Sequence, residues 1–162
     1  MALELYRIDD RLIHGQVVVG WGQPLDLRFI VLVDDEVAAS DWEQELYRMG
    51  VPSDMEVYFD TVESAAGSLS RYQDDERRGL LLTGDIDTMA RLVDASENIR
   101  RVNVGGLHHR PGRIQRLRYV FLTRDEEAQL RALAERGLDV TAQDVPAARP
   151  VALDELLEGS GS

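Results

Sequence analysis

One histidine and a group of charged side chains follow the first apolar run of the sequence, in the segment RIDDRLIHGQVVVGWG at residues 7–22. Asp9 and Asp10 precede Arg11 and then His14. A neutral imidazole has an in-plane lone pair that can attack phosphorus, and about half of it is neutral near its reference pKa of roughly 6.5. These residues predict a phosphoryl-accepting histidine; a helix-capping pair of aspartates beside a structural histidine is the alternative.

The residues around His14 have types suited to a phosphoryl group. Arg11 could neutralise the phosphoryl oxygens, while Asp9 or Asp10 could orient Arg11 or fix the imidazole tautomer. Gly15 would let an anion come close to the backbone at the start of a helix, where free N–H groups and the positive dipole end favour it.

A second segment with glycines, VNVGGLHHRPGR at residues 102–113, is predicted to open at the same edge of the fold. It is either an anion-binding or docking loop, or a solvated connection whose glycines only make turns. Neighbouring histidines on an extended chain point in opposite directions, so His108 and His109 make a poor metal pair, and no metal site is predicted.

Charge is distributed unevenly along the chain. The formal net charge is -12, which disfavours nucleic-acid binding, yet residues 99–124 hold seven arginines and no acidic residue. Within this stretch, Arg110 and Arg113 are the candidates to meet an anionic partner. The alternative is that these arginines pair with helix carboxylates on the surface.

Apolar runs and turn signals predict alternating strands and helices. The predicted strands cover residues 3–8, 28–33, 55–59, 79–83 and 101–104, with two further candidates at 119–122 and 138–142. Capping-box spacing predicts helix starts at Ser40, Asp60 and Thr123.

This alternation predicts an α/β fold, with a central, mainly parallel β-sheet and helices on both faces. The length favours a single domain over residues 1–157, and residues 158–162 are expected to be a flexible tail or an expression remnant. Ligands of such sheets bind beyond the carboxyl ends of the strands, which is where His14 is expected.

Several classes of protein are disfavoured. The absence of cysteine excludes disulfides and thiolate chemistry, and no dinucleotide-binding, Walker-type or serine-elbow motif is present. No cofactor is predicted. The sequence shows no signal peptide or membrane-spanning stretch, so a cytoplasmic protein is expected.

The run from Arg7 to Val17, RIDDRLIHGQV, closely resembles the N-terminal signature of the IIB subunit of the mannose/fructose/sorbose class of the bacterial phosphotransferase system (PTS). The resemblance continues through residues 35–38, 102–106, 112–113 and 134–138, and so covers the whole predicted domain.

The resemblance implies a phosphotransferase component that takes a phosphoryl group from a phosphohistidine on a IIA protein, through Nδ1 of His14. In the family, the group then passes to a sugar presented by the membrane subunits IIC and IID, which would place the protein at the inner face of the membrane. Arg11 would cradle the phosphoryl group, with Asp10, Gln16 and Thr83 as supports. The docking candidates are Gly105, Gly106, His109, Arg110 and Arg113.

Two other functions stay open on the sequence. The domain could be a regulatory phosphohistidine module of an incomplete phosphotransferase system, in which phosphorylation changes a protein contact. It could also be an anion-binding α/β domain without phosphoryl transfer. The sequence does not specify the sugar.

Overall fold

The predicted apolar runs form the parallel strands of a central sheet in the computed structural model, which describes residues 3–158. The strands are β1 (Leu3–Ile8), β2 (Phe29–Val33), β3 (Glu56–Asp60), β4 (Gly79–Thr83), β5 (Arg101–Val104) and β8 (Asp139–Ala142). Strands β2 and β4 are buried at every position, as is typical of strands covered on both faces. Along β2, alternate side chains enter the core on opposite sides of the sheet.

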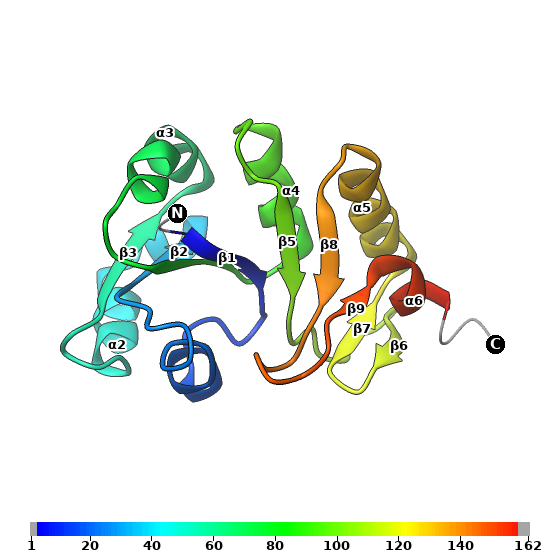
Figure 1. The fold of residues 1–162 in the computed structure, drawn as a ribbon, viewed down its shortest axis with the longest axis horizontal. Coiled ribbons are helices and arrows are strands. Elements are labelled where there is room, and N and C mark those ends of the chain that lie inside the picture. The colour runs from blue at the N-terminus through cyan, green and yellow to red at the C-terminus, as the bar shows by residue number, and fades with distance from the viewer. Residues whose placement is uncertain (1–2, 159–162) are drawn as a thin grey trace.

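Seven strands form the large sheet, in the order β3-β2-β4-β1-β5-β8-β9 (Figure 1). Every neighbouring pair is parallel except β8 with β9 (Val151–Ala152), which is antiparallel. The predicted mainly parallel sheet is therefore confirmed. The candidate strand at 119–122 is β7 (Val120–Leu122), but it lies outside this sheet and forms an antiparallel hairpin with β6 (Ile114–Leu117).

Helices cover both faces of the large sheet, as predicted. One face packs against helices α3 to α6, and the other packs against the π-helix η1 and helices α1 and α2. The bounds are η1 Gln16–Trp21, α1 Asp35–Ala38, α2 Asp41–Met49, α3 Val62–Gln73, α4 Ile86–Asp94, α5 Arg124–Glu135 and α6 Leu153–Glu158. Helix α6 includes Glu158, the first residue of the predicted tail, and the other residues of that tail lie outside the described part of the chain.

Two of the three predicted helix caps are present. Ser40 caps α2 by accepting from the Glu43 N–H, and Thr123 forms a complete capping box on α5. The predicted cap at Asp60 is wrong by one residue, because Thr61 forms the capping box of α3. Asp60 instead ends β3, and its carboxylate accepts a hydrogen bond from the hydroxyl of Tyr72 on the same helix.

Strands β1 and β5 are neighbours whose connections run to opposite faces of the sheet. The chain leaves β1 through η1 on one face, and it leaves β5 through the β6–β7 hairpin and α5, which packs on the other face. Loops that diverge in this way leave space at the carboxyl edge of a parallel sheet, which is where such sheets bind ligands. The segments containing His14 and Gly105 are these two loops.

Candidate active site

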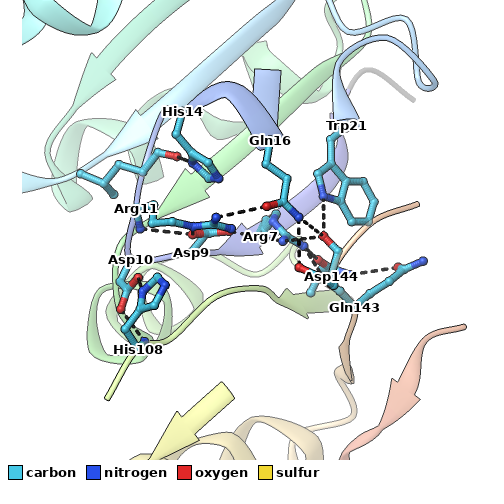
Figure 2. Close-up of polar contacts among 12 residues, drawn as sticks. Arg7, Asp9, Asp10, Arg11, His14, Gln16, Trp21, His108, Gln143 and Asp144 are labelled. Carbon is cyan, nitrogen blue, oxygen red and sulfur yellow. Dashed lines mark hydrogen bonds and ion pairs between the residues drawn. The ribbon is translucent and has the colours of Figure 1, made fainter. Parts of the chain in front are cut away.

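His14 lies in the loop between β1 and η1, and its ring is fixed by the backbone (Figure 2). Leu12 has a φ of 59°, a left-handed conformation that is uncommon for leucine, and its carbonyl oxygen is 2.8 Å from Nδ1 of His14. A carbonyl only accepts, so in this arrangement Nδ1 carries the proton and donates it. A backbone carbonyl therefore sets the tautomer, and neither of the two aspartates expected from the sequence does so.

The electrostatics of His14 favour its neutral form. Burial lowers the pKa of the imidazole below its ordinary value, and this effect outweighs the carbonyl of Leu12 and the charge of Asp9, which act to raise it. In the neutral ring the lone pair lies on Nε2, which is buried and has no hydrogen-bond partner within the described part of the chain. His14 is thus a neutral imidazole at neutral pH, which is the protonation state that a nucleophilic histidine requires.

Arg11 is held by two side chains. Its backbone N–H and Nε donate to Oδ1 of Asp9 at 3.1 and 3.3 Å, and Nη2 donates to Oδ2 at 3.4 Å. Its Nη1 donates to Oε1 of Gln16 at 3.1 Å. Asp9 thus orients the arginine, and Gln16 supports it by fixing the guanidinium from the other side.

A fully buried ion pair lies beneath these residues and was missed from the sequence. Arg7 and Asp9 have no exposed surface and approach to 3.3 Å. Arg7 also stacks on Trp21 at 4.7 Å, and it donates to Asn103 and to the Gln143 carbonyl. The signal in the sequence was an arginine within an apolar strand, directly before the motif. Since Asp9 lies between two guanidinium groups, Arg7, Asp9 and Arg11 together keep one positive charge.

The loop between β8 and β9 closes the site on one side. The backbone oxygen of Asp144 accepts from Nε1 of Trp21 at 3.3 Å, and Oδ1 accepts from Nε2 of Gln16 at 3.0 Å. Figure 2 shows Gln16, Trp21 and Arg7 converging on this loop. No local pattern in the sequence marks Asp144, because its contacts with Gln16 and Trp21 join residues more than a hundred positions apart.

The two predicted docking glycines pack against the same buried network. A Cβ at Gly105 would lie 2.3 Å from Nη2 of Arg7, and one at Gly106 would lie 3.4 Å from Oδ1 of Asp9. A side chain at Gly105 would therefore displace the guanidinium of Arg7. The glycines allow the loop after β5 to approach the ion pairs, which is a packing role.

Asp10 connects the two loops instead of facing His14. Its carboxylate accepts from the backbone N–H of His108 at 2.8 Å and lies 2.5 Å from Nδ1 of that ring. Its backbone N–H donates to the Gly106 carbonyl at 2.8 Å. The support expected of Asp10 is thus indirect: it ties the loop after β5 to the loop that carries His14.

Arg113 is not available to a partner, contrary to its predicted docking role. Its side chain is 4% exposed, and its Nε and Nη2 donate to the carboxylate of Glu126 at 3.0 and 2.7 Å. Its Nη1 donates to the carbonyl of His108 at 2.7 Å. Arg116 is likewise paired with Glu127 on α5. For these two arginines the structure shows the alternative interpretation, pairing with helix carboxylates.

Arg110 and His109 remain on the outer side of the loop. Both are exposed, and the ring of His109 packs edge-on against Phe121 of β7 at 5.7 Å. Within residues 3–158, no carboxylate lies within 4.0 Å of the Arg110 guanidinium. Of the docking candidates with charged side chains, Arg110 is the one whose charge is free.

The last two predicted supports contribute little side-chain chemistry. Thr83 is fully buried at the end of β4, where its carbonyl accepts from the Asp9 N–H at 2.9 Å and its hydroxyl donates to the Asp85 carbonyl. Thr83 therefore fixes the backbone beneath the site. Gly15 is exposed and has open space around the position of a Cβ, so the chain leaves room beside His14.

Between residues 3 and 158, no group of three or more histidine, aspartate or glutamate side chains is placed to hold a metal ion. None of the helices in that range combines the length and the apolar character needed to cross a membrane.

The mainly parallel sheet carries a neutral histidine and a hydrogen-bonded arginine at its carboxyl edge. These features are those of an α/β protein that carries a phosphoryl group. The sequence matches the model of the PTS system sorbose subfamily IIB component over residues 3–162. The chain therefore belongs to this family, and it is a phosphotransferase component of the mannose/fructose/sorbose class.

Individual relatives agree with this assignment. The chain is 32% identical over 145 residues to the N-acetylgalactosamine-specific phosphotransferase enzyme IIB component 1 of Escherichia coli, covering 88% of this chain and 90% of that protein. It is 32% identical over 149 residues to the mannose-specific EIIAB component of the same species, covering 90% of this chain and 45% of that longer protein. The crystal structure of the IIBSor domain of the Klebsiella pneumoniae sorbose permease superposes with a TM-score of 0.87, at 28% identity and with 100% of both chains covered.

Proposed function

We propose that His14 is the residue that carries the phosphoryl group. The observation that supports this most directly is the neutral imidazole of His14 in the loop whose Arg11 is fixed by Asp9 and Gln16. In the transfer, the lone pair of one ring nitrogen forms the new N–P bond while the P–N bond to the donor breaks. The guanidinium of Arg11 then stabilises the charge on the phosphoryl oxygens.

Transfer through Nδ1, which the family resemblance implies, requires a change at the ring. Nδ1 now carries the proton and donates it to the Leu12 carbonyl at 2.8 Å. Before Nδ1 can attack, that hydrogen bond must break and the ring must change tautomer, so that the proton moves to Nε2 and the lone pair lies on Nδ1. Nuclear magnetic resonance of the phosphorylated protein distinguishes phosphate on Nδ1 from phosphate on Nε2.

The proposed partners are a phosphorylated IIA protein as donor and the membrane subunits IIC and IID, which present the sugar at the inner face of the membrane. The mannose-specific relative, an EIIAB component by name, supports a IIA donor. The proposed docking surface is the loop at residues 105–113, with His109 and Arg110 on its outer side. The free charge of Arg110 would attract a phosphorylated partner to a protein whose formal net charge is -12.

Intact-mass measurement after incubation with a phosphorylated IIA protein of the mannose class tests the role of His14. We expect one acid-labile, base-stable phosphoryl group on the wild type and none on His14→Ala. His109→Ala is the matched control for the loss of an imidazole. It alters the proposed docking loop and should slow transfer, but it should reach the same end point of one phosphoryl group per chain. Equal uptake by His14→Ala and wild type would overturn the proposal.

A further inference from the structure

Asp144 occupies a junction between the candidate site and the rest of the fold. Its backbone oxygen accepts hydrogen bonds from Trp21, Gln16 and Arg7 at 3.3, 3.4 and 3.3 Å. Its carboxylate accepts from Nε2 of Gln16 at 3.0 Å through Oδ1, and from Nη2 of Arg118 at 3.1 Å through Oδ2. The proposed transfer reaction has so far given this carboxylate no role.

The contacts of Asp144 determine which way the amide of Gln16 faces. Both atoms of Asp144 near Nε2 of Gln16 are oxygens, and oxygens of this kind only accept. The amide oxygen is thereby directed to the other side, where it accepts from Nη1 of Arg11 at 3.1 Å. In the reverse orientation, an NH₂ group would face the guanidinium and an oxygen would face the carboxylate.

The negative charge of Asp144 is offset at the surface. Arg118, which is 85% exposed on the turn of the β6–β7 hairpin, pairs with Oδ2 at 3.1 Å. The carboxylate is 21% exposed and so lies mostly inside the protein. This pairing reduces its repulsion of an incoming phosphoryl group, which leaves its hydrogen bond to Gln16 as its main effect on the site.

We propose that Asp144 is a positioning residue for phosphoryl transfer. It holds the amide of Gln16, and the amide holds the guanidinium of Arg11 in the orientation that meets the phosphoryl oxygens. The inference rests on the proposed role of His14 as the phosphoryl acceptor. It assigns to the loop after β8 a part in the transfer step itself, separate from any part in docking.

Phosphoramidate tests the transfer step without a protein partner. Phosphoramidate reacts as its zwitterion, whose nitrogen carries the extra proton. The lone pair of one ring nitrogen of His14 forms the new N–P bond, the P–N bond of phosphoramidate breaks, and ammonia leaves with the electron pair of that bond. The imidazole keeps its proton on the other nitrogen. The measured quantity is the rate of phosphate uptake by the full chain, followed by intact mass at saturating phosphoramidate.

We expect Asp144→Ala to slow uptake about tenfold, because a lost hydrogen bond to a carboxylate and a misplaced guanidinium have effects of that order. Asp144→Asn keeps an oxygen that can accept from Gln16, so its rate should stay within about twofold of wild type. Asp144→Ala combined with Gln16→Ala should be no slower than Gln16→Ala alone. Asp139→Ala is the control, because it removes a carboxylate from an exposed position at the other end of β8.

A charge exchange provides a second test that does not depend on how well Asp144→Ala folds. Gln16→Glu places a carboxylate oxygen against the carboxylate of Asp144 and should slow uptake. Adding Asp144→Asn to it supplies an NH₂ donor opposite the new glutamate and should restore much of the rate. A residue that acted only on overall stability would not produce this reciprocal rescue.

The outcomes separate the inference from the function on which it rests. If wild-type His14 takes up no phosphate from either donor, the proposed function fails. If the wild type takes up phosphate and Asp144→Ala is equally fast, the inference fails alone. The inference also fails if Asp144→Asn is as slow as Asp144→Ala, if the effects of Asp144→Ala and Gln16→Ala add, or if Gln16→Glu is not rescued.

Discussion

Replacement of Gly105 by alanine should displace the guanidinium of Arg7 and so weaken the buried ion pair between Arg7 and Asp9. We expect this to destabilise the site more than the replacement of an exposed residue would. The new Cβ would lie 2.3 Å from Nη2 and 2.5 Å from Cζ of Arg7. Contacts of this kind are comfortable at about 3.5 Å, so the guanidinium would have to move by about 1 Å. Arg7 has no exposed surface, so it cannot move outward into solvent.

The contacts of Arg7 set the size of the effect. Its Nη2 lies 3.3 Å from both Oδ2 of Asp9 and the backbone oxygen of Asp144, and a movement of about 1 Å breaks such bonds. Lost hydrogen bonds to charged groups and overpacking each cost about 1 to 3 kcal/mol. We expect Gly105→Ala to lower the free energy of unfolding by about 3 kcal/mol, which corresponds to about 6 to 12 °C in Tm for a domain of this size.

Thermal unfolding and phosphoramidate uptake measure the two consequences. The Tm should fall as stated, and uptake by His14 should slow because Asp9 loses its buried counter-ion and no longer fixes Arg11. Gly15→Ala is the control: Gly15 has φ -53° and no atom within 4 Å of a Cβ, so its Tm should stay close to wild type. A Gly105→Ala protein with the Tm of the wild type would refute the argument that the loop is packed on Arg7.

Further predictions concern the pH dependence of His14, two arginines of the loop after β5, and the sugar acceptor. Burial lowers the pKa of His14 below 6.5. The rate of phosphoramidate uptake should therefore stay constant as the pH falls through 6.5, and it should decrease only when the pH reaches the lowered pKa of His14 in the folded protein. The folded state then binds fewer protons than the unfolded one, so stability should fall as pH drops from 6.5 to that lowered pKa, and His14→Ala should remove this effect. Arg110→Glu should slow transfer from phospho-IIA at low salt and leave phosphoramidate uptake unchanged. Arg113→Ala should lower stability by about 3 kcal/mol in thermal unfolding, because it removes the counter-ion of the mostly buried Glu126. A phospho-IIA donor and this chain should form no sugar phosphate without a membrane fraction, because a histidine that must meet a second protein lacks an enclosed, oriented pocket for a sugar hydroxyl. Rapid formation in an assay for sugar phosphate would contradict this.

Features determined by neighbouring residues could be predicted from the sequence alone. Strands β1, β4 and β5 have the predicted bounds, and Ser40 and Thr123 cap helices as their spacing indicates. Strand periodicity and capping depend on residues a few positions apart, so a single sequence contains the information. The motif around His14 is equally local, and its position at the carboxyl end of β1 followed from the α/β pattern.

The tertiary structure determined how the site is supported, because those contacts join distant segments. Gln16 and Asp144 are 128 positions apart, and Arg7 and Asn103 are 96 apart. Arg113 was predicted to be a docking residue, but folding brings Glu126 to its guanidinium, and no spacing rule distinguishes that pair from a free charge. Local patterns thus placed the histidine, while strand order and loop packing decided which charges surround it, because only the assembled sheet brings the loops after β1, β5 and β8 to one edge.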